Sequence, residues 1–402
     1  GGPGQRSASI IDDMMVATLD SHEPAIELAA RLSEMAVARG GKPLTTVIEP
    51  KQWGGQQIER SADKTKLTMH MHHKAMATVR EWLPTLAETG VVPTGIPTGT
   101  ALQRALDELT LLEGTGPLTQ DQKDVRSITG QLRWLTKRIM RIVKHTWKLS
   151  CIQGRASEGA KTAALGVVAL VYFCAGEGHT WDENAVDGSF RGVLKGTVDA
   201  RRGTSIRKID AEAREAAVTA PKELEGVCDA TWSRGQDGTA DVYALAITYK
   251  GAAVLVELKK SPIVGGSSAD LESLGLLKLS DKAVWALIVA SRLSIDTGPA
   301  MTLLCDAEAA LRASMGEASV VRLKHIMRRA AIVRDRVLEG SIAMAHVPDA
   351  ANAVDIFTKR RTRAEKVERM LAYLSGGQTL RQPVAPPIVA VLAVMADWLG
   401  VP

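Results

Sequence analysis

Four acidic residues in the second half of the chain have types and spacing that suit binding of divalent metal ions. Asp229 lies late in one predicted strand and Asp306 ends another, whereas Glu272 and Asp355 lie at the starts of predicted helices. Hard cations need several carboxylate oxygens that converge on one point. Two such ions about 4 Å apart can activate an attacking water molecule and stabilise a leaving oxygen. The four acids are therefore candidates for a hydrolytic metal site.

The elements that must position these acids are strands and helices in a mixed order. Apolar runs separated by short Gly turns predict strands, and longer runs with helical spacing predict helices. The predicted strands are 224–232, 241–250, 252–260, 301–305 and 342–347, and the predicted helices are 268–292, 308–315, 323–338 and one from Asn352 onward. Three strands, a helix, a strand, helices, a strand and a helix is the order of the ribonuclease H fold.

Residues 223–360 also resemble the ribonuclease H domain of copia-type retrotransposon Pol polyproteins. The matching motifs are Asp229-Ala-Thr-Trp232, Ser267-Ser-Ala-Asp-Leu-Glu272, Lys324-His-Ile326, Arg334-Asp-Arg-Val337, and His346-Val-Pro348 with Asn352, Asp355 and Lys359. The resemblance implies that Asp229, Glu272, Asp306 and Asp355 are catalytic Mg²⁺ ligands. It implies Asp270 as a second candidate on the same helix as Glu272, and RNA or an RNA–DNA hybrid as the partner.

The first part of the chain resembles the end of the reverse transcriptase of the same family. Ile10-Ile-Asp-Asp-Met14 is similar to the polymerase hairpin, with Asp12 and Asp13 as its acids. Residues 120–134 look like the connection that follows the palm. The third polymerase aspartate and the fingers would precede residue 1, so we expect that this chain does not polymerise DNA.

The predicted fold class is α/β, a truncated reverse-transcriptase palm and connection followed by a ribonuclease H-like mixed five-stranded sheet with flanking helices. The front part should contain helices over 23–39, 74–88, 121–150 and 161–174. The predicted segments are a palm remnant (1–90), a linker with a helical thumb or connection region (91–175), an insertion (176–222), the ribonuclease H-like domain (223–362) and a C-terminal helical and Pro-rich extension (363–402).

Basic residues are concentrated on two stretches of the predicted helices and directly after the last acid. Such residues are either solvated helix faces or contacts to nucleic-acid phosphates, which are independent of sequence and sensitive to salt. The candidates for phosphate contact are Arg133, Lys137, Arg138, Arg141, Lys144, Lys148, Arg328, Arg329, Lys359, Arg360 and Arg361. The net charge of +5 is mild, so the position of these residues is more informative than the total.

Composition restricts the compartment and the relation to membranes. The four cysteines form no CxxC pair, which predicts reduced core residues in an intracellular, reducing compartment. The longest apolar run, Ile388 to Leu399, is shorter than the ~18–20 residues of a membrane span. This run is predicted either to dock on a partner protein or to pack on the chain's own core.

Two functions of different classes remain open from the sequence. The first is a domesticated retrotransposon fragment that serves as a structural, RNA-binding component of a large ribonucleoprotein, ribosome-like and mitochondrial in our hypothesis. Two observations favour this first function. The reverse-transcriptase part would lack some of its active-site residues, and the basic patches are retained. The alternative is a Mg²⁺-dependent ribonuclease H that cuts the RNA strand of RNA–DNA hybrids, favoured by the four carboxylates.

Overall fold

The structure is a computed structural model that divides into two units, residues 1–59 and 60–402. It describes residues 23–42, 51–53, 55–89, 100–185, 223–232, 241–292, 295, 297, 300–316, 324–359 and 362–377. In the first unit, α1 (Glu23–Ala38) confirms a predicted helix, and β1 (Gln52–Trp53) pairs antiparallel with β2 (Gln56–Arg60). Asp12, Asp13 and the run from Ile388 to Leu399 lie outside the described residues, so the predictions for them stay predictions.

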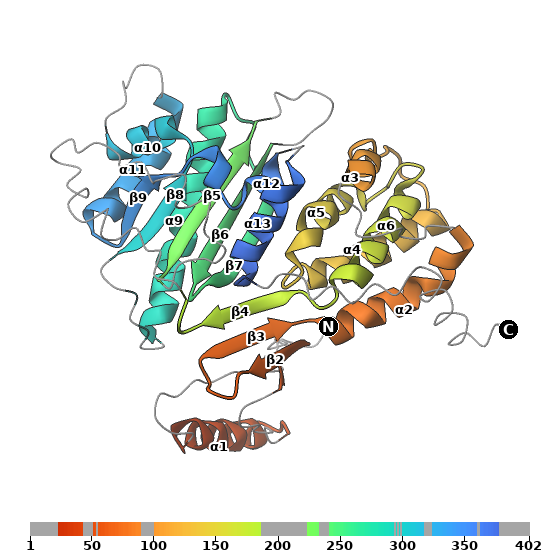
Figure 1. Cartoon of the computed structure of the whole chain (residues 1–402), viewed down its shortest axis with the longest axis horizontal. Coiled ribbons are helices and arrows are strands. Elements are labelled where there is room, and N and C mark those ends of the chain that lie inside the picture. Colours follow the sequence, from red (N-terminus) through yellow and green to blue (C-terminus); the bar gives the residue numbers. More distant parts are fainter. Residues whose placement is uncertain are drawn as a thin grey trace, which may run out of the picture. The chain divides into compact units, whose positions relative to one another are not determined.

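A mixed five-stranded sheet organises the second unit, as predicted. Its strands are β5 (Glu225–Thr231), β6 (Val242–Tyr249), β7 (Ala252–Lys260), β8 (Met301–Cys305) and β9 (Ile342–His346). They lie in the order β7-β6-β5-β8-β9 (Figure 1). β5, β6 and β7 pair antiparallel, whereas β5, β8 and β9 pair parallel. Helix α9 (Ser268–Arg292) connects β7 to β8, and α10 (Glu308–Met315) and α11 (Lys324–Leu338) connect β8 to β9, which is a ribonuclease H-like arrangement.

Both faces of the sheet are buried, which explains why its central strands are apolar almost throughout. Alternate side chains point to opposite faces of a strand. In β8, Leu303 and Cys305 therefore pack with α9, α10 and α11, whereas Leu304 packs on the other face with α12 (Asp355–Thr358) and α13 (Ala364–Ser375). The site described below lies at the end of the sheet where β5 and β8 both terminate.

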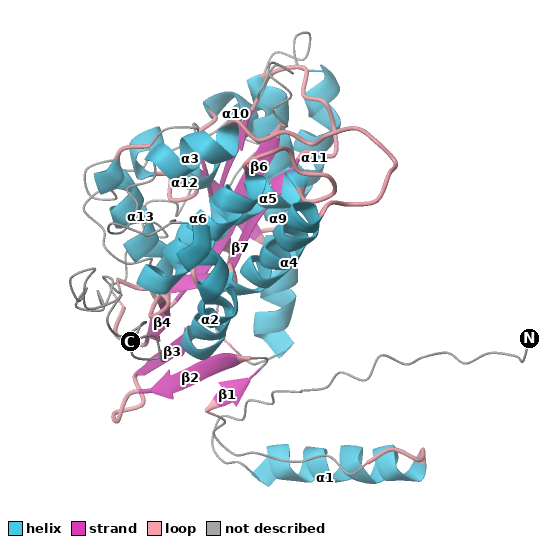
Figure 2. Cartoon of the chain, turned by 90° about the vertical axis from the view of Figure 1, so that its right-hand side faces the viewer, coloured by secondary structure: helices cyan, strands magenta, loops and turns pink. Residues whose placement is uncertain are grey.

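A second core belongs to the helices that precede the sheet (Figure 2). These helices are α2 (His72–Thr89), α3 (Thr100–Asp107), α4 (Gln120–Leu135), α5 (Val143–Ile152) and α6 (Ala160–Cys174). The single helix predicted over 121–150 is wrong, because α4 ends at Leu135 and a short 3₁₀ turn, η1 (Met140–Ile142), precedes α5. The break lets Leu132 remain in the helical core while Met140 and Val143 join the core of the sheet.

One further element differs from the prediction, and a predicted helix, α13, has a packing role that the sequence did not indicate. The segment predicted as an irregular insertion begins with a strand, β4 (Gly178–Asp182), which pairs antiparallel with β3 (Lys66–His70). Helix α13 lies beyond the predicted end of the ribonuclease H-like domain at residue 362, yet Met370 and Leu374 belong to the core of the sheet. None of the described helices is long and apolar enough to span a membrane. All four cysteines are free, and Cys151 is exposed rather than part of the core.

Candidate metal centre

The parallel pairing of β5 and β8 brings two of the predicted acids close together. Cys228 lies directly opposite Cys305 in the register, so the residues that follow them lie side by side: Asp229 within β5, and Asp306 directly after the end of β8. Asp355 begins α12, which packs on β5, and Glu272 lies near the start of α9 on the opposite face. All four acids therefore come from the same end of the sheet.

The side chains of these acids form two overlapping groups. Ligand atoms of Asp229, Asp306 and Asp355 all lie within 4.8 Å of one another. Ligand atoms of Glu272, Cys305 and Asp306 do the same. Asp306 belongs to both groups. The structure thus brings together the four acids that the sequence singled out, and it adds a thiol that the sequence did not suggest as a ligand.

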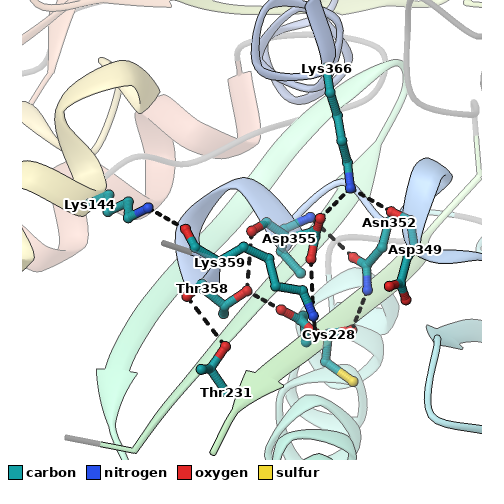
Figure 3. A network of polar contacts seen from close by, with 11 residues as sticks. Lys144, Cys228, Thr231, Asp349, Asn352, Asp355, Thr358, Lys359 and Lys366 are labelled. Atoms are coloured by element: carbon teal, nitrogen blue, oxygen red, sulfur yellow. Dashed lines mark hydrogen bonds and ion pairs between the residues drawn. The ribbon is translucent and has the colours of Figure 1, made fainter. Parts of the chain in front are cut away.

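One oxygen of each of two acids is already occupied by a donor from the chain itself (Figure 3). Thr358 Oγ1 donates a hydrogen bond to Asp229 Oδ2, and Lys366 Nζ donates to Asp355 Oδ2. Lys366 Nζ also donates to the backbone oxygen of Asp349, over 2.6 Å. These bonds restrict the rotation of both carboxylates and leave the Oδ1 atom of each available.

In this group of acids, three buried carboxylate oxygens lack a hydrogen-bond donor among the described residues: Asp229 Oδ1, Asp355 Oδ1 and Glu272 Oε2. Buried polar atoms are nearly always satisfied by the protein or by water, and an orphaned carboxylate oxygen is especially costly. Carboxylate oxygens are also the ligands that Mg²⁺ and Mn²⁺ prefer. The donor set therefore fits a hard divalent cation, with Asp229, Glu272, Asp306 and Asp355 as the residues that would hold it.

Burial makes this group of acids difficult to ionise in the absence of a cation. Burial raises the pKa of Asp229 to about 6, although Lys359 and Thr358 oppose the shift. Burial, the charge of Asp229 and a hydrogen bond with Asp349 raise the pKa of Asp306 to about 8. Burial, followed by the proximity of Cys305 and Asp229, raises the pKa of Glu272 well above its ordinary value. A divalent cation would reverse these shifts by favouring the charged carboxylates.

Lys359 is the cation nearest to the two orphaned aspartate oxygens. Its Nζ lies 3.7 Å from Asp229 Oδ1 and 3.4 Å from Asp355 Oδ1. Burial alone would lower the pKa of Lys359, but Asp229, Asp355 and Asp306 together raise it above its ordinary value. The sequence analysis placed Lys359 among the phosphate contacts, whereas the structure places its ammonium group among the carboxylates.

Asp270, the second candidate on the helix, does not belong to either group of ligands. Arg329 Nη1 lies 2.5 Å from Asp270 Oδ1, and the backbone N–H of Gly266 donates to Asp270 Oδ2 over 3.0 Å. Ser267 Oγ accepts a hydrogen bond from the backbone N–H of Asp270, so this acid belongs to the cap of α9. Asp270 thus contributes to the N-terminal cap of the helix that carries Glu272, and it forms an ion pair with Arg329.

Three supporting residues were not identified as functional from the sequence. Asn352 is fully buried and donates to the backbone oxygen of Cys228 over 3.0 Å, which holds the segment before Asp355 against β5. Thr358 and Lys366 orient the carboxylates as described above. Asn352 and Thr358 lie within the motif that ends at Lys359, which was the available signal. Lys366 lies outside that motif, and its sequence context contains no comparable signal.

Internal partners occupy several of the residues predicted to contact phosphates. Arg138 donates to His179 Nδ1 over 3.0 Å, and burial lowers its pKa to about 10. Arg141 forms ion pairs with Glu177 and Glu368. Lys144 Nζ donates to the backbone oxygen of Lys359, and burial lowers its pKa. These three cations connect parts of the fold.

The other predicted phosphate contacts have different positions. Arg133, Lys137 and Arg328 are exposed, and Lys148 is half-buried. Lys137 Nζ lies over the ring of Trp134, 3.4 Å from its centroid. Arg360 and Arg361 lie outside the described residues. Arg133 and Arg328 are therefore well placed to test the prediction of nucleic-acid binding.

Comparisons with known proteins return ribonuclease H domains among solved structures. Ribonuclease H1 from the halophilic archaeon Halobacterium salinarum NRC-1 is 18% identical, with a TM-score of 0.24, and the match covers 32% of this chain and 89% of that one. The N-terminal ribonuclease H domain of Rv2228c from Mycobacterium tuberculosis, solved as a fusion with maltose-binding protein, is 17% identical, with a TM-score of 0.25, covering 32% and 86%. No family model and no curated protein matches the chain.

Proposed function

We propose that this protein is a divalent-cation-dependent ribonuclease of the ribonuclease H type, which hydrolyses the RNA strand of an RNA–DNA hybrid. The observation that carries the proposal is the convergence of Asp229, Glu272, Asp306 and Asp355, with three buried oxygens that no donor of the described chain satisfies. A scaffold would gain nothing from burying four carboxylates together, because each raises the cost of ionising the others. The choice of a hybrid substrate follows from the resemblance to copia-type domains.

The residues of the chain have distinct parts in this proposal. Bound Mg²⁺ or Mn²⁺ would activate water and stabilise the leaving oxygen of the phosphodiester. Thr358 and Lys366 hold Asp229 and Asp355 so that each presents one oxygen to the site. Asp306 and Lys359 are partly exposed, which places the open side of the site next to solvent, where a phosphate backbone can approach.

Cleavage of a labelled RNA–DNA hybrid by the purified full chain, with Mg²⁺ or Mn²⁺, tests this function. The double variant Asp229→Asn, Asp306→Asn should lose at least about 100-fold in rate, since it removes ligands from the centre of the site. Asp335→Asn, an exposed acid on α11, is the matched control and should cleave like the wild type. Absence of cleavage by the wild type under both metals would reject the proposal.

A second candidate function is a structural RNA-binding component of a large ribonucleoprotein, with a mitochondrial, ribosome-like assembly as the proposed setting. The observation that favours it is the pair Lys359 and Lys366, whose ammonium groups already offset part of the carboxylate charge. In the same experiment, this function predicts salt-sensitive RNA binding without cleavage.

A further inference from the structure

The two orphaned aspartate oxygens face a single ammonium group. Asp229 Oδ1 and Asp355 Oδ1 have no donor among the described residues, and Lys359 Nζ lies 3.7 and 3.4 Å from them. The opposite oxygens of both carboxylates are held by Thr358 and Lys366 (Figure 3). Lys359 therefore lies beside the oxygens that a cation at this end of the site would use.

The backbone on both sides of this side chain is anchored. The N–H of Lys359 donates to the backbone oxygen of Asp355 over 3.0 Å. Its carbonyl accepts a hydrogen bond from Lys144, which projects from α5 in the helical part of the chain. Two separate elements thus fix the main chain of Lys359 beside the site, and the ion pairs with Asp229 and Asp355 hold its ammonium group there.

The other end of the site contains no such cation. No ion pair with Glu272 occurs among the described residues, although its Oε2 atom is buried without a donor. Glu272 shares its group with Asp306 and Cys305, and this group includes neither Asp229 nor Asp355. The site is thus asymmetric: Lys359 forms ion pairs with Asp229 and Asp355 at one end, whereas at the other its charge acts on Glu272 without an ion pair among the described residues.

We propose that Lys359 occupies one of the two cation positions of the site, so that the wild-type protein binds a single divalent ion, held at the end formed by Glu272 and Asp306. An ammonium group and a divalent ion a few ångströms apart repel each other, and more strongly among largely buried carboxylates than in water. The ion therefore binds where no lysine is present. This inference rests on the proposed function only for the view that the site takes a hard divalent cation.

Counting bound Mn²⁺ on the full chain tests the inference without any need for hydrolysis. Equilibrium dialysis, with free Mn²⁺ followed by electron paramagnetic resonance, should give one ion per wild-type chain. Lys359→Met should give two, because the Oδ1 atoms of Asp229 and Asp355 then become available to a second ion. Lys278→Met, a lysine on α9 that forms an ion pair with Asp281 outside the site, is the matched control and should bind one ion.

A charge-preserving variant keeps the test valid if Lys359→Met folds poorly. Lys359→Arg retains a cation at this end and should still bind one Mn²⁺ per chain. In addition, Mn²⁺ should raise the melting temperature of Lys359→Met more than that of the wild type, since the ion replaces the lost counter-charge. An equal number of ions in Lys359→Met and wild type, or two ions in the wild type, would overturn the inference.

The outcomes separate this inference from the proposed function. A gain of one Mn²⁺ in Lys359→Met with no cleavage of the hybrid by the wild type would support the inference and reject the ribonuclease. Cleavage by a wild-type protein that binds two ions would support the ribonuclease and reject the inference.

Discussion

Arg141 and Glu368 are separated by 227 positions in the sequence and form an ion pair with two hydrogen bonds, of 2.6 and 2.7 Å. Arg141 lies in η1, and Glu368 lies on α13, two residues after Lys366. Arg141 Nε also donates to Glu177 over 2.9 Å. This pair therefore connects the helical part of the chain to the helix that holds Asp355 in place.

Loss of the Arg141 side chain should destabilise the protein more than loss of an exposed arginine. Arg141→Met should lower the free energy of unfolding by about 1.5–3 kcal/mol, the usual value of hydrogen bonds to charged groups. Arg312→Met is the control, because Arg312 forms an exposed pair with Glu308 that is worth about 0.5 kcal/mol. Urea denaturation measures both. Equal losses of unfolding free energy in the two variants would show that the ion pairs of Arg141 do not stabilise the contact between the helical part of the chain and α13.

The Thr358 hydroxyl should matter for metal binding and catalysis more than for stability. Thr358→Val keeps the shape of the side chain but removes the donor to Asp229 Oδ2. Partners that orient metal ligands typically contribute about 10–100-fold in metal affinity or activity, so we expect a loss in that range. Thr248→Val is the control, because Thr248 is also buried, on β6, and donates to the backbone oxygen of Glu225 away from the four acids. Mn²⁺ titration of both variants in the Lys359→Met background, where Asp229 Oδ1 is open to an ion, should separate them, and equal affinities would contradict the role of Thr358.

Metal-free protein should lose stability as the pH rises from about 4 to about 8. The pKa of Asp229 is raised to about 6 and that of Asp306 to about 8, so the folded state keeps protons that the unfolded state has released. When the folded state binds more protons, the free energy of unfolding falls as the pH rises. The stabilisation is complete below the unfolded pKa of about 4 and is lost through the folded values.

Urea denaturation in EDTA between pH 4 and pH 8.5 measures this dependence. Asp306→Asn should flatten the decline between pH 6 and pH 8, because the amide does not ionise. Added Mg²⁺ should reduce the decline in the wild type, since the cation favours the charged carboxylates. A wild-type curve that matches that of Asp306→Asn in EDTA would contradict the prediction.

The exposed arginines should contribute to RNA binding without contributing to stability. Arg133→Gln and Arg328→Gln should each weaken RNA binding and reduce the slope of log K against log salt by about 1. Their unfolding free energies should change by less than about 0.5 kcal/mol, as is usual for surface substitutions. Fluorescence anisotropy over a series of salt concentrations measures the slope. An unchanged slope in both variants would assign these residues to a solvated surface.

The order of strands and helices over residues 223–347 could be predicted because each element has a clear local pattern. The central strands are buried on both faces and read as continuous apolar runs, and α9 has a long helical repeat that begins after two serines. The break between α4 and α5 could not be predicted in the same way. No Gly or Pro marks it, and it exists because Leu132 and Met140 pack into different cores.

Motif and strand position together select Asp229, Glu272, Asp306 and Asp355 as candidate ligands from the sequence, with Asp270 as a second candidate on the same helix as Glu272. Only the tertiary structure separates Asp270 from the other acids, because Arg329 and the backbone N–H of Gly266, which precedes α9, occupy its two oxygens. The position of Lys359 was decided in the same way. Its charge alone is compatible with contact to a phosphate, whereas its anchored backbone and the two orphaned oxygens nearby place it inside the site. Local pattern specifies which residue types a site contains, but long-range packing specifies which of them meet.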